Sequence, residues 1–514
     1  MSIYGSGSGA GSVVTPAIAR LRGVAPAWHP GRARMLFHSL DFLAFLLVVL
    51  VLYHVLIRDW SHRKLMLLAA SWLFYATWSP AFLLLLIAST AADFQLARWI
   101  YARRWEAPGV ERPEGRARAR GLLVASLLLN LGVLGWFKYG LFLYGSIGEI
   151  LALPPAPRIL AVTVPLGVSF YTFHAISYIV DTYRGIRPPT SSFFDYALYV
   201  AFFPQLVAGP ITRWGFFGPQ LVSRREVGWH RIDGALFLLA VGFVKKVACA
   251  DSLGGYVDQV YAHPLAASRL EHWIVLYAYA FQIYFDFSGY TDIAMGVAGL
   301  LGFRLPENFR HPYLAENPSE FWRRWHISLS SWLRDYLYVP LGGNRLGNVR
   351  TYVNLMITML LGGLWHGAAW TFVVWGGFHG AWLAVHRALS GRDWWRSRAG
   401  AAAATPATPL WLRRIATFHL VAFAWVPFRA ASLADAGDFF VGLVSGRPLV
   451  AALPVGPILL VALGAATHGL ATRVELASWW RTVPRPVQGA AYGLVVVLIG
   501  LFSAQSGRFI YFQF

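Results

Sequence analysis

The sequence predicts an all-α membrane protein, a polytopic helical bundle of about 11–13 membrane segments. Two features of composition and one of pattern support this fold class. Hydrophobic residues make up 57% of the 514 residues, against about 45–50% in soluble domains, and charged residues make up only 13%, against about 25%. Apolar runs near the roughly twenty residues that a membrane crossing requires recur along the chain. A disordered chain, a coiled coil and an ordinary cytosolic enzyme are therefore excluded.

Residues 1–34 differ from the rest of the chain. They are rich in Gly, Ser, Pro and Ala, and they contain four arginines and no acidic residue. They lack the apolar stretch of about 7–15 residues that a signal peptide needs. We therefore expect a disordered tail, which need not belong to the native protein, followed by one transmembrane domain over residues 35–514.

The apolar runs define the predicted membrane segments. The run at 65–99 should be a bent pair of helices, because Trp78, Ser79 and Pro80 interrupt it, and the run at 352–386 should hold two helices. Several runs are too short for a full crossing, so we expect some segments to be re-entrant. Irregular backbone at membrane depth needs shielding by protein or a water-filled cavity, which indicates an internal chamber. The predicted segments are 37–57, 65–99, 121–144, 159–180, 194–210, 235–250, 272–300, 352–386, 411–428, 455–472 and 487–504.

Loop cations predict the orientation of the bundle. The stretch 98–120 contains seven arginines against three glutamates, and short loops rich in Lys and Arg stay on the cytoplasmic side. The net charge of +20 therefore reflects membrane loops and contacts with lipid headgroups. Nucleic acid is not an expected partner, although a basic chain can bind it.

The sequence also excludes several classes of site. A single cysteine, Cys249, rules out an intramolecular disulfide and any CxxC metal or redox site, and its apolar surroundings predict a buried thiol. We find no HExxH zinc motif, no GxSxG nucleophile in a strand–helix setting and no P-loop. No metal ion and no permanently bound cofactor are expected.

The stretch from 306 to 379 holds the most informative polar residues. Asn317, Pro318 and Glu320 predict the start of a helix, with Glu320 paired to Arg324 one turn later. Because this helix is too polar to cross lipid alone, we expect it at the interface or dipping into the protein. Its residues on a common face, by three- and four-residue spacing, are Trp322, His326, Leu329, Ser330 and Leu333, with Arg323, Arg324 and Arg334 beside them.

A second helix is predicted from Asn354 to His366, and its glycines at 362–363 allow close helix contact. An ionisable group at membrane depth is by default a functional candidate. Neutral His366 can accept the proton of a hydroxyl as that hydroxyl attacks an acyl thioester, while His326 holds the acceptor, polarises the carbonyl or tunes the base. The alternative is that His366 only hydrogen-bonds a neighbouring helix. Spacing alone cannot decide whether the two histidines converge.

Other polar residues at membrane depth have two interpretations. Lys245 and Lys246 are expected to reach lipid headgroups; the alternative is that they attract the phosphates of a donor. A further group of residues either lines the chamber or forms a structural hydrogen-bond cluster. That group is Asp286, Ser288, Tyr290 and Asp292.

Two carboxylates receive structural interpretations. Asp335 should pair with Arg334 or with a neighbouring helix. His54 and Asp59 have the spacing of a glycerolipid-type acyltransferase, but that motif needs a supporting soluble domain. Here it closes the first apolar segment, so we do not expect it to be catalytic.

Longer motifs resemble a known family. The runs FWRRWHISLSSWLRDYLYVPLGGNR and LLGGLWHGAAWTFVVWGGFHG look like the signature of the membrane-bound O-acyltransferase superfamily, in its bacterial alginate O-acetyltransferase-like branch. The resemblance implies that His366 is catalytic and that His326 is its active-site companion. The supporting stretches are 165–185, 202–213, 284–303 and the terminal FIYFQF. Substrate-binding candidates are Trp322, Arg323, Arg324, Ser330, Trp365, Asp286, Ser288 and Tyr290.

The resemblance also implies a function. The bundle should enclose a catalytic chamber or tunnel in the bacterial inner membrane, reached by acetyl-CoA or another thioester donor from the cytoplasm. The acceptor should be an extracytoplasmic polysaccharide, such as alginate, or a periplasmic esterase-like partner. Two alternatives stay open, namely transfer of D-alanyl or another acyl group to a cell-wall polymer, and a non-enzymatic polysaccharide transporter or channel. Inverted internal repeats and paired intramembrane carboxylates would favour the transporter or channel.

Overall fold

A computed structural model describes most of the chain after the predicted tail. The described residues are 35–37, 39–160, 162–223, 227–390, 408–445, 448, 453–470, 473–502 and 510. The predicted tail over residues 1–34, most of the Ala/Pro/Thr-rich loop at 394–411 and most of the terminal FIYFQF motif lie outside these residues.

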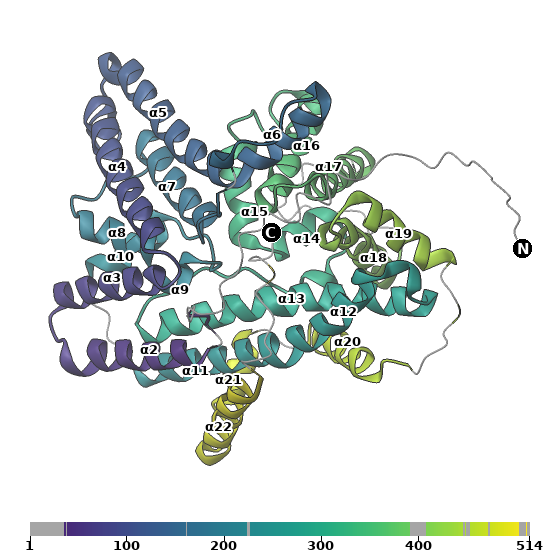
Figure 1. Cartoon of the computed structure of the whole chain (residues 1–514). Coiled ribbons are helices and arrows are strands. Elements are labelled where there is room, and N and C mark those ends of the chain that lie inside the picture. The colour runs from purple at the N-terminus through teal and green to yellow at the C-terminus, as the bar shows by residue number, and fades with distance from the viewer. Residues whose placement is uncertain are drawn as a thin grey trace, which may run out of the picture.

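Helices dominate the described chain (Figure 1). The strands within it are β1 (Trp105–Ala107) and β2 (Val110–Glu111), an antiparallel pair at the turn between two long helices. The predicted all-α class is therefore confirmed for the part of the chain that the structure describes.

The first helices confirm the predicted break in the run at 65–99. Helix α3 ends at Ala76 and α4 begins at Pro80, because the Ser79 hydroxyl accepts a hydrogen bond from the Phe82 amide at 3.4 Å and Pro80 starts the helix without needing an amide partner. The elements of this region are α2 (Leu40–Val51), η2 (Leu52–Leu56), α3 (Trp60–Ala76), α4 (Pro80–Arg104), α5 (Arg116–Leu134), η4 (Gly135–Tyr139) and α6 (Gly140–Leu151).

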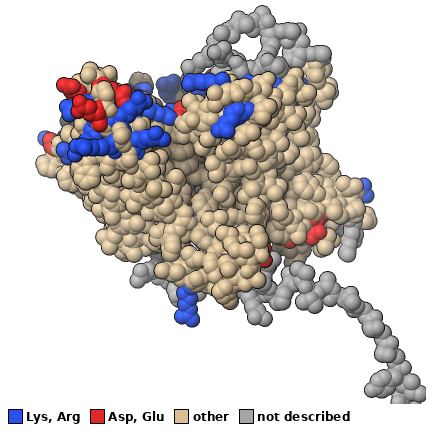
Figure 2. All heavy atoms as spheres, turned by 90° about the horizontal axis from the view of Figure 1, so that it is seen from above, with Lys and Arg blue, Asp and Glu red and all other residues tan. Residues whose placement is uncertain are grey.

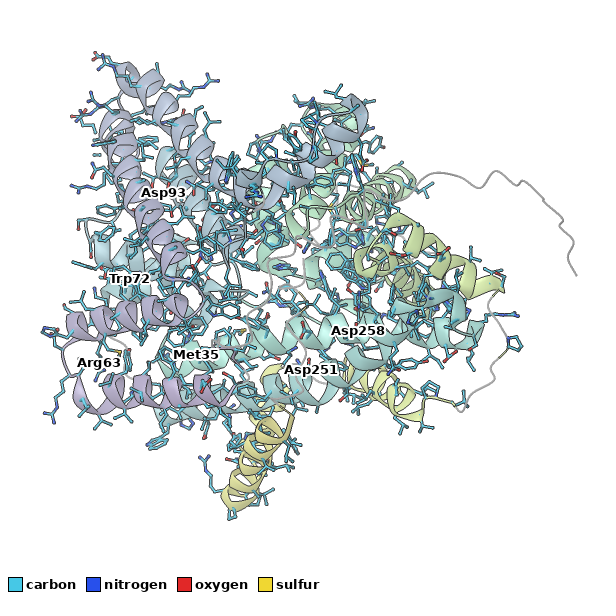
Figure 3. All side chains as sticks on the ribbon, in the orientation of Figure 1. Met35, Arg63, Trp72, Asp93, Asp251 and Asp258 are labelled. Atoms are coloured by element: carbon cyan, nitrogen blue, oxygen red, sulfur yellow. The ribbon has the colours of Figure 1, made fainter. Side chains whose placement is uncertain are left out.

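Helices α4 and α5 form a hairpin joined by a buried polar contact. Asp93 of α4 accepts hydrogen bonds from the Asn130 side-chain amide at 2.7 Å and from the Ser126 hydroxyl at 3.2 Å, both on α5. Asp93 is labelled in Figure 3, inside the hairpin. Polar side chains that bond across helices are a common way to join helices where the surroundings are apolar.

Two predicted segments in the next region are divided into shorter elements. The run at 159–180 starts at the 3₁₀ turn η5 (Arg158–Leu160) and becomes α-helical at Val168, and the run at 194–210 divides at Phe202 into two short helices. Residues 196–212 are nevertheless all buried in protein, as irregular structure inside a membrane would require. The helices here are α7 (Val168–Tyr183), α8 (Phe193–Ala201), α9 (Phe203–Leu206) and α10 (Trp214–Val222).

Helix α13 (Arg269–Leu300) runs through the middle of the molecule (Figure 1). Its 32 residues give a length of about 48 Å at 1.5 Å per residue. A capping box fixes its start, because Ser268 and Glu271 each accept a hydrogen bond from the other's backbone amide. Before it come α11 (Trp229–Phe243), the π-helical η6 (Val244–Ala250) with buried Cys249, and α12 (Asp251–Ala262).

The segment with the predicted catalytic histidines departs from the single helix expected after Asn317. Asn317 does cap a helix, accepting from the Glu320 amide at 2.9 Å, but that helix stops at Arg324. Trp325 is extended and His326 is left-handed, with φ of 43°, so the expected common face through His326 is wrong. The elements are α14 (Pro318–Arg324), α15 (Ile327–Leu333), η9 (Arg334–Tyr338), α16 (Gly347–His366) and α17 (Trp370–Ser390).

The predicted pair of helices in the run at 352–386 is confirmed by α16 and α17. The remaining helices follow the predicted apolar runs at 411–428, 455–472 and 487–504 closely, with additional helices between them. They are α18 (Leu410–Arg429), α19 (Leu433–Ser445), α20 (Val455–Thr467), α21 (Arg473–Trp480) and α22 (Arg485–Phe502).

Two helical stretches of the described chain are long and apolar enough to cross a membrane by themselves, Pro80–Arg104 and Pro113–Leu151. The number of membrane segments stays a prediction. Lys and Arg gather on one face of the molecule, partly at the α4–α5 turn beside a few acidic residues (Figure 2). That distribution agrees with the cytoplasmic side that the loop arginines predict.

Candidate active site

A partly open cavity of about 140 Å³ lies between α14, α15, η9, α16 and α17. This space has room for several water molecules, since one water needs roughly 10–15 Å³. Most of its walls are apolar, and the polar groups on them are few. The lining residues are Trp322, Arg323, Ile327, Leu329, Ser330, Ser331, Leu333, Arg334, Tyr338, Leu355, Thr358, Met359, Gly362, His366, Trp375 and Leu383.

His366 is the last residue of α16 and lines this cavity. Its side chain is 5% exposed and is surrounded by aromatic rings, with the centroids of Trp375 and Phe428 at 5.1 and 5.2 Å, both edge-on. The imidazole is therefore held in a mostly apolar setting and is still next to open space.

Close packing of α16 against α17 fixes this end of the helix. A Cβ atom on Gly363 would overlap the carbonyl oxygen of Phe372, and one on Gly376 would overlap that of Met359. The expected close contact at the glycine pair is confirmed, and only residues without a side chain fit at these two positions.

His326 lies between α14 and α15, fully buried, with its ring centroid 6.4 Å from that of His366. The turn between α14 and α15 and the end of α16 thus bring both imidazoles to one place. The left-handed backbone costs a residue with a side chain roughly 1–2 kcal/mol. Asn308 supports this turn, because its side-chain oxygen accepts from the Ser328 hydroxyl at 2.6 Å and its carbonyl accepts from the Ile327 amide at 3.0 Å.

The predicted substrate-binding residues of this region divide into two groups. Trp322, Arg323 and Ser330 line the cavity. Arg324 does not, and its Nε instead donates to Glu320 at 3.0 Å, which confirms the predicted pair within the helix. Trp365 is buried against Phe173, with the rings stacked at 5.4 Å, and supports the wall behind His366.

Arg334 and Arg323 are the cations among the described lining residues. The predicted pairing of Asp335 is confirmed, since it contacts Arg334 at 2.6 Å and Arg213, from the loop before α10, at 2.7 Å. Arg184, directly after α7, also donates to the Asp335 carbonyl at 3.3 Å. These contacts hold Arg334 in place beside the cavity.

The polar residues of α13 lie outside the cavity lining. Lys246 pairs with Asp286 and with Asp251, each at 2.7 Å, and Lys245 pairs with Asp292 at 2.7 Å. Asp251 is labelled in Figure 3, at the start of α12. For Asp286 and Asp292 the structural interpretation is therefore the better one.

The expectation that Lys245 and Lys246 reach lipid headgroups is wrong. Lys246 is 3% exposed, and both ammonium groups contact carboxylates of α13 inside the protein. Ser288 and Tyr290, the other chamber candidates on α13, are buried near this cluster and away from the cavity lining.

The spacing of His54 and Asp59 has a structural explanation. His54 Nε2 lies 2.9 Å from the carbonyl oxygen of Leu300, and Asp59 caps α3 by accepting from the His62 amide at 2.9 Å. The two residues thus make separate contacts, as expected for a motif that is not catalytic here.

Sequence reasoning missed three residues near His366. Lys138 and Tyr139 of η4 contact the carbonyl oxygens of residues 364–366. A lysine inside the apolar run at 121–144 was the available signal, because intramembrane ionisable residues are functional candidates. His379, fully buried and edge-on to Trp375 at 4.8 Å, is a third imidazole in this region, and no sequence signal separated it from the other histidines.

Comparison with known proteins identifies the family. Residues 186–392, which include both His326 and His366, match the sequence profile described as MBOAT, membrane-bound O-acyltransferase family. The Pseudomonas aeruginosa protein named "Probable alginate O-acetylase AlgI" is 42% identical over 450 residues, which are 85% of this chain and 82% of the relative. The chain belongs to the membrane-bound O-acyltransferase family.

Further relatives of this membrane-bound O-acyltransferase act on other polymers by name. A "Peptidoglycan O-acetyltransferase" from Helicobacter pylori is 37% identical over 74% of this chain and 73% of its own length. A "Teichoic acid D-alanyltransferase" from Streptococcus thermophilus is 30% identical over 43% of this chain and 57% of its own length. The resemblance read from the motifs is confirmed, and the protein is a membrane-integral O-acyltransferase.

Proposed function

We propose that this protein transfers an acetyl group from a cytoplasmic thioester, acetyl-CoA, for O-acetylation of an extracytoplasmic polysaccharide. The acceptor is an alginate-like polymer or an esterase-like periplasmic partner that passes the group on. The setting is the bacterial inner membrane, which the chain crosses several times. The observation that carries this proposal is the buried His366 imidazole, which lines a cavity with His326 beside it.

This geometry supports the following reaction. His366 takes the proton of the acceptor hydroxyl while the hydroxyl oxygen attacks the thioester carbonyl. The carbon–oxygen bond forms, the carbon–sulfur bond breaks, and the thiolate leaving group receives the proton. His326 lies close enough to hold the acceptor or polarise the carbonyl. Burial of both rings keeps bulk water, a competing nucleophile, away from the thioester.

The charges of the cavity favour acetyl over D-alanyl transfer. A D-alanyl group carries an ammonium, and a buried ammonium needs a carboxylate or several acceptors. Among the described residues that line the cavity are two arginines and no Asp or Glu. Their guanidinium groups suit a donor with phosphates, and the described lining offers no carboxylate to an amino-acyl ammonium.

The test is acetyl transfer by purified protein in proteoliposomes, with labelled acetyl-CoA supplied on one side and polysaccharide on the other. We expect His366→Ala to lower the rate by at least about 10²–10⁴-fold, the usual contribution of a general base. The matched control is His263→Ala, which changes an exposed histidine after α12 and should leave the rate unchanged. Wild-type turnover by folded His366→Ala protein would refute the assignment, and label carried by intact donor across the membrane would indicate a transporter.

A further inference from the structure

The end of α16 is held by groups from a distant part of the chain. The last carbonyls of an α-helix have no partner within the helix. Here Tyr139 donates its hydroxyl to the carbonyl of Leu364 at 2.9 Å. Lys138 donates its ammonium to the carbonyls of Trp365 and His366, the second at 3.1 Å. Three consecutive carbonyls, ending at the candidate base itself, thus find partners on η4.

Placing the ammonium of Lys138 at this position costs free energy, because its surroundings in the sequence are apolar. It falls within the helical stretch Pro113–Leu151, which is apolar enough to cross a membrane. A charged residue in such a stretch is retained only with a partner. Its ammonium lies within 5.8 Å of the Trp365 ring centroid, and a cation at a helix C-terminus is favourable.

The π-helical turn explains how two adjacent residues reach the same target. Residues 135–139 form the π-helix η4 between α5 and α6. Such turns are uncommon and are frequent at functional sites. The wider turn brings the side chains of Lys138 and Tyr139 together at the end of α16, and a hydrocarbon side chain at position 138 would leave the carbonyls of residues 365 and 366 without these donors.

We propose that Lys138 is a positioning residue for His366, assisted by Tyr139. This inference rests on the proposed function of His366 as the base. The carbonyl of His366 belongs to the residue whose imidazole must face the substrate, so holding that carbonyl fixes the point from which the side chain projects. Packing at Gly363 fixes the same end from α17. A misplacement of about 1 Å at a reacting group can lower a rate by 10²-fold.

The experiment compares Lys138→Met, Lys138→Arg and Tyr139→Phe in the proteoliposome assay. We expect Lys138→Met to lower kcat by about 100-fold and to leave the KM for acetyl-CoA within about twofold, because the donor site is intact. Lys138→Arg keeps the charge and the donors, so it should recover most of kcat. Tyr139→Phe, which frees one carbonyl only, should have a smaller effect on kcat.

The matched control is Lys64→Met, which removes another partly buried lysine, paired with Asp195 at 2.6 Å. The Lys64→Met variant measures the loss of stability on removing a partly buried lysine, and its kcat should equal that of the wild-type protein. If Lys138→Met does not fold, Lys138→Gln takes its place, with the same expected direction. Folded Lys138→Met protein with wild-type kcat, or an equal loss of kcat for Lys138→Met and Lys138→Arg, would overturn the inference. Activity of His366→Ala would instead overturn the proposed function.

Discussion

Two clusters of polar groups lie inside this membrane protein, and they differ in what their members contact. On α13 and η6, lysines and aspartates pair with one another at 2.7 Å. At the cavity, His366 lies among aromatic rings beside open space, and the buried ring of His326 lies behind it, 6.4 Å away between centroids. Both clusters qualify as functional candidates by their depth. Their contacts separate them, because a charge already paired inside the protein is held in place, whereas a group next to a cavity can meet a substrate.

The largest effect that tests this comparison should come from His326. Replacing it with Asn removes the imidazole but keeps a residue that tolerates left-handed backbone. We expect kcat to fall by about 10²–10⁴-fold with residual turnover, and the thermal unfolding midpoint in detergent to change little. His326→Ala should be equally inactive and somewhat less stable. Wild-type kcat for His326→Asn would remove this residue from the site.

The α13 cluster should respond in the opposite way. Lys245→Met leaves the buried Asp292 without its lysine, which should lower the free energy of unfolding by about 3–5 kcal/mol. The double variant Lys245→Met/Asp292→Leu removes both charges and should recover much of that loss. Turnover per folded molecule should stay at the wild-type value in both. A loss of kcat without a loss of stability would make this cluster part of the active site.

The smallest effect should come from the cavity arginines. Arg334→Met removes a cation beside the cavity, so the KM for acetyl-CoA should rise roughly tenfold, as for one lost charge-assisted contact of about 1.5–3 kcal/mol, while kcat changes little. The control is Arg310→Met, an exposed arginine paired with Glu307 at 2.7 Å, with KM unchanged. If the two variants behave alike, Arg334 does not contact the donor.

Local signals predicted the parts of the fold that depend on local chemistry. The break at Ser79 and Pro80, the cap at Asn317 and the glycine contact of α16 all follow from the residues involved and their neighbours. The single helix through His326 was wrong because helical spacing takes no account of a left-handed residue that tertiary contacts impose. That turn depends on Asn308, which no local pattern connects to it.

The candidate site could be predicted only in part for the same reason. The two histidines were found through motif resemblance, and their proximity is a property of the packed helices. The contact of Lys138 with the end of α16 joins two helical stretches far apart in the sequence, so a single sequence contains no record of it. Likewise, whether Lys245 and Lys246 face lipid depends on the carboxylates that pair with them. Those carboxylates belong to α12 and α13, outside the element that carries the lysines.

The contact of Gly363 with the Phe372 backbone limits how the active site can change its size. Two helices that touch backbone to backbone cannot slide or separate slightly without losing that fit, so the wall with the base behaves as one rigid block. Room for a bulkier acyl group must then come from α14 and α15, the two short helices opposite. The acyl group is therefore accommodated on the wall that carries His326, and substitutions that enlarge the site there must preserve the left-handed turn between α14 and α15.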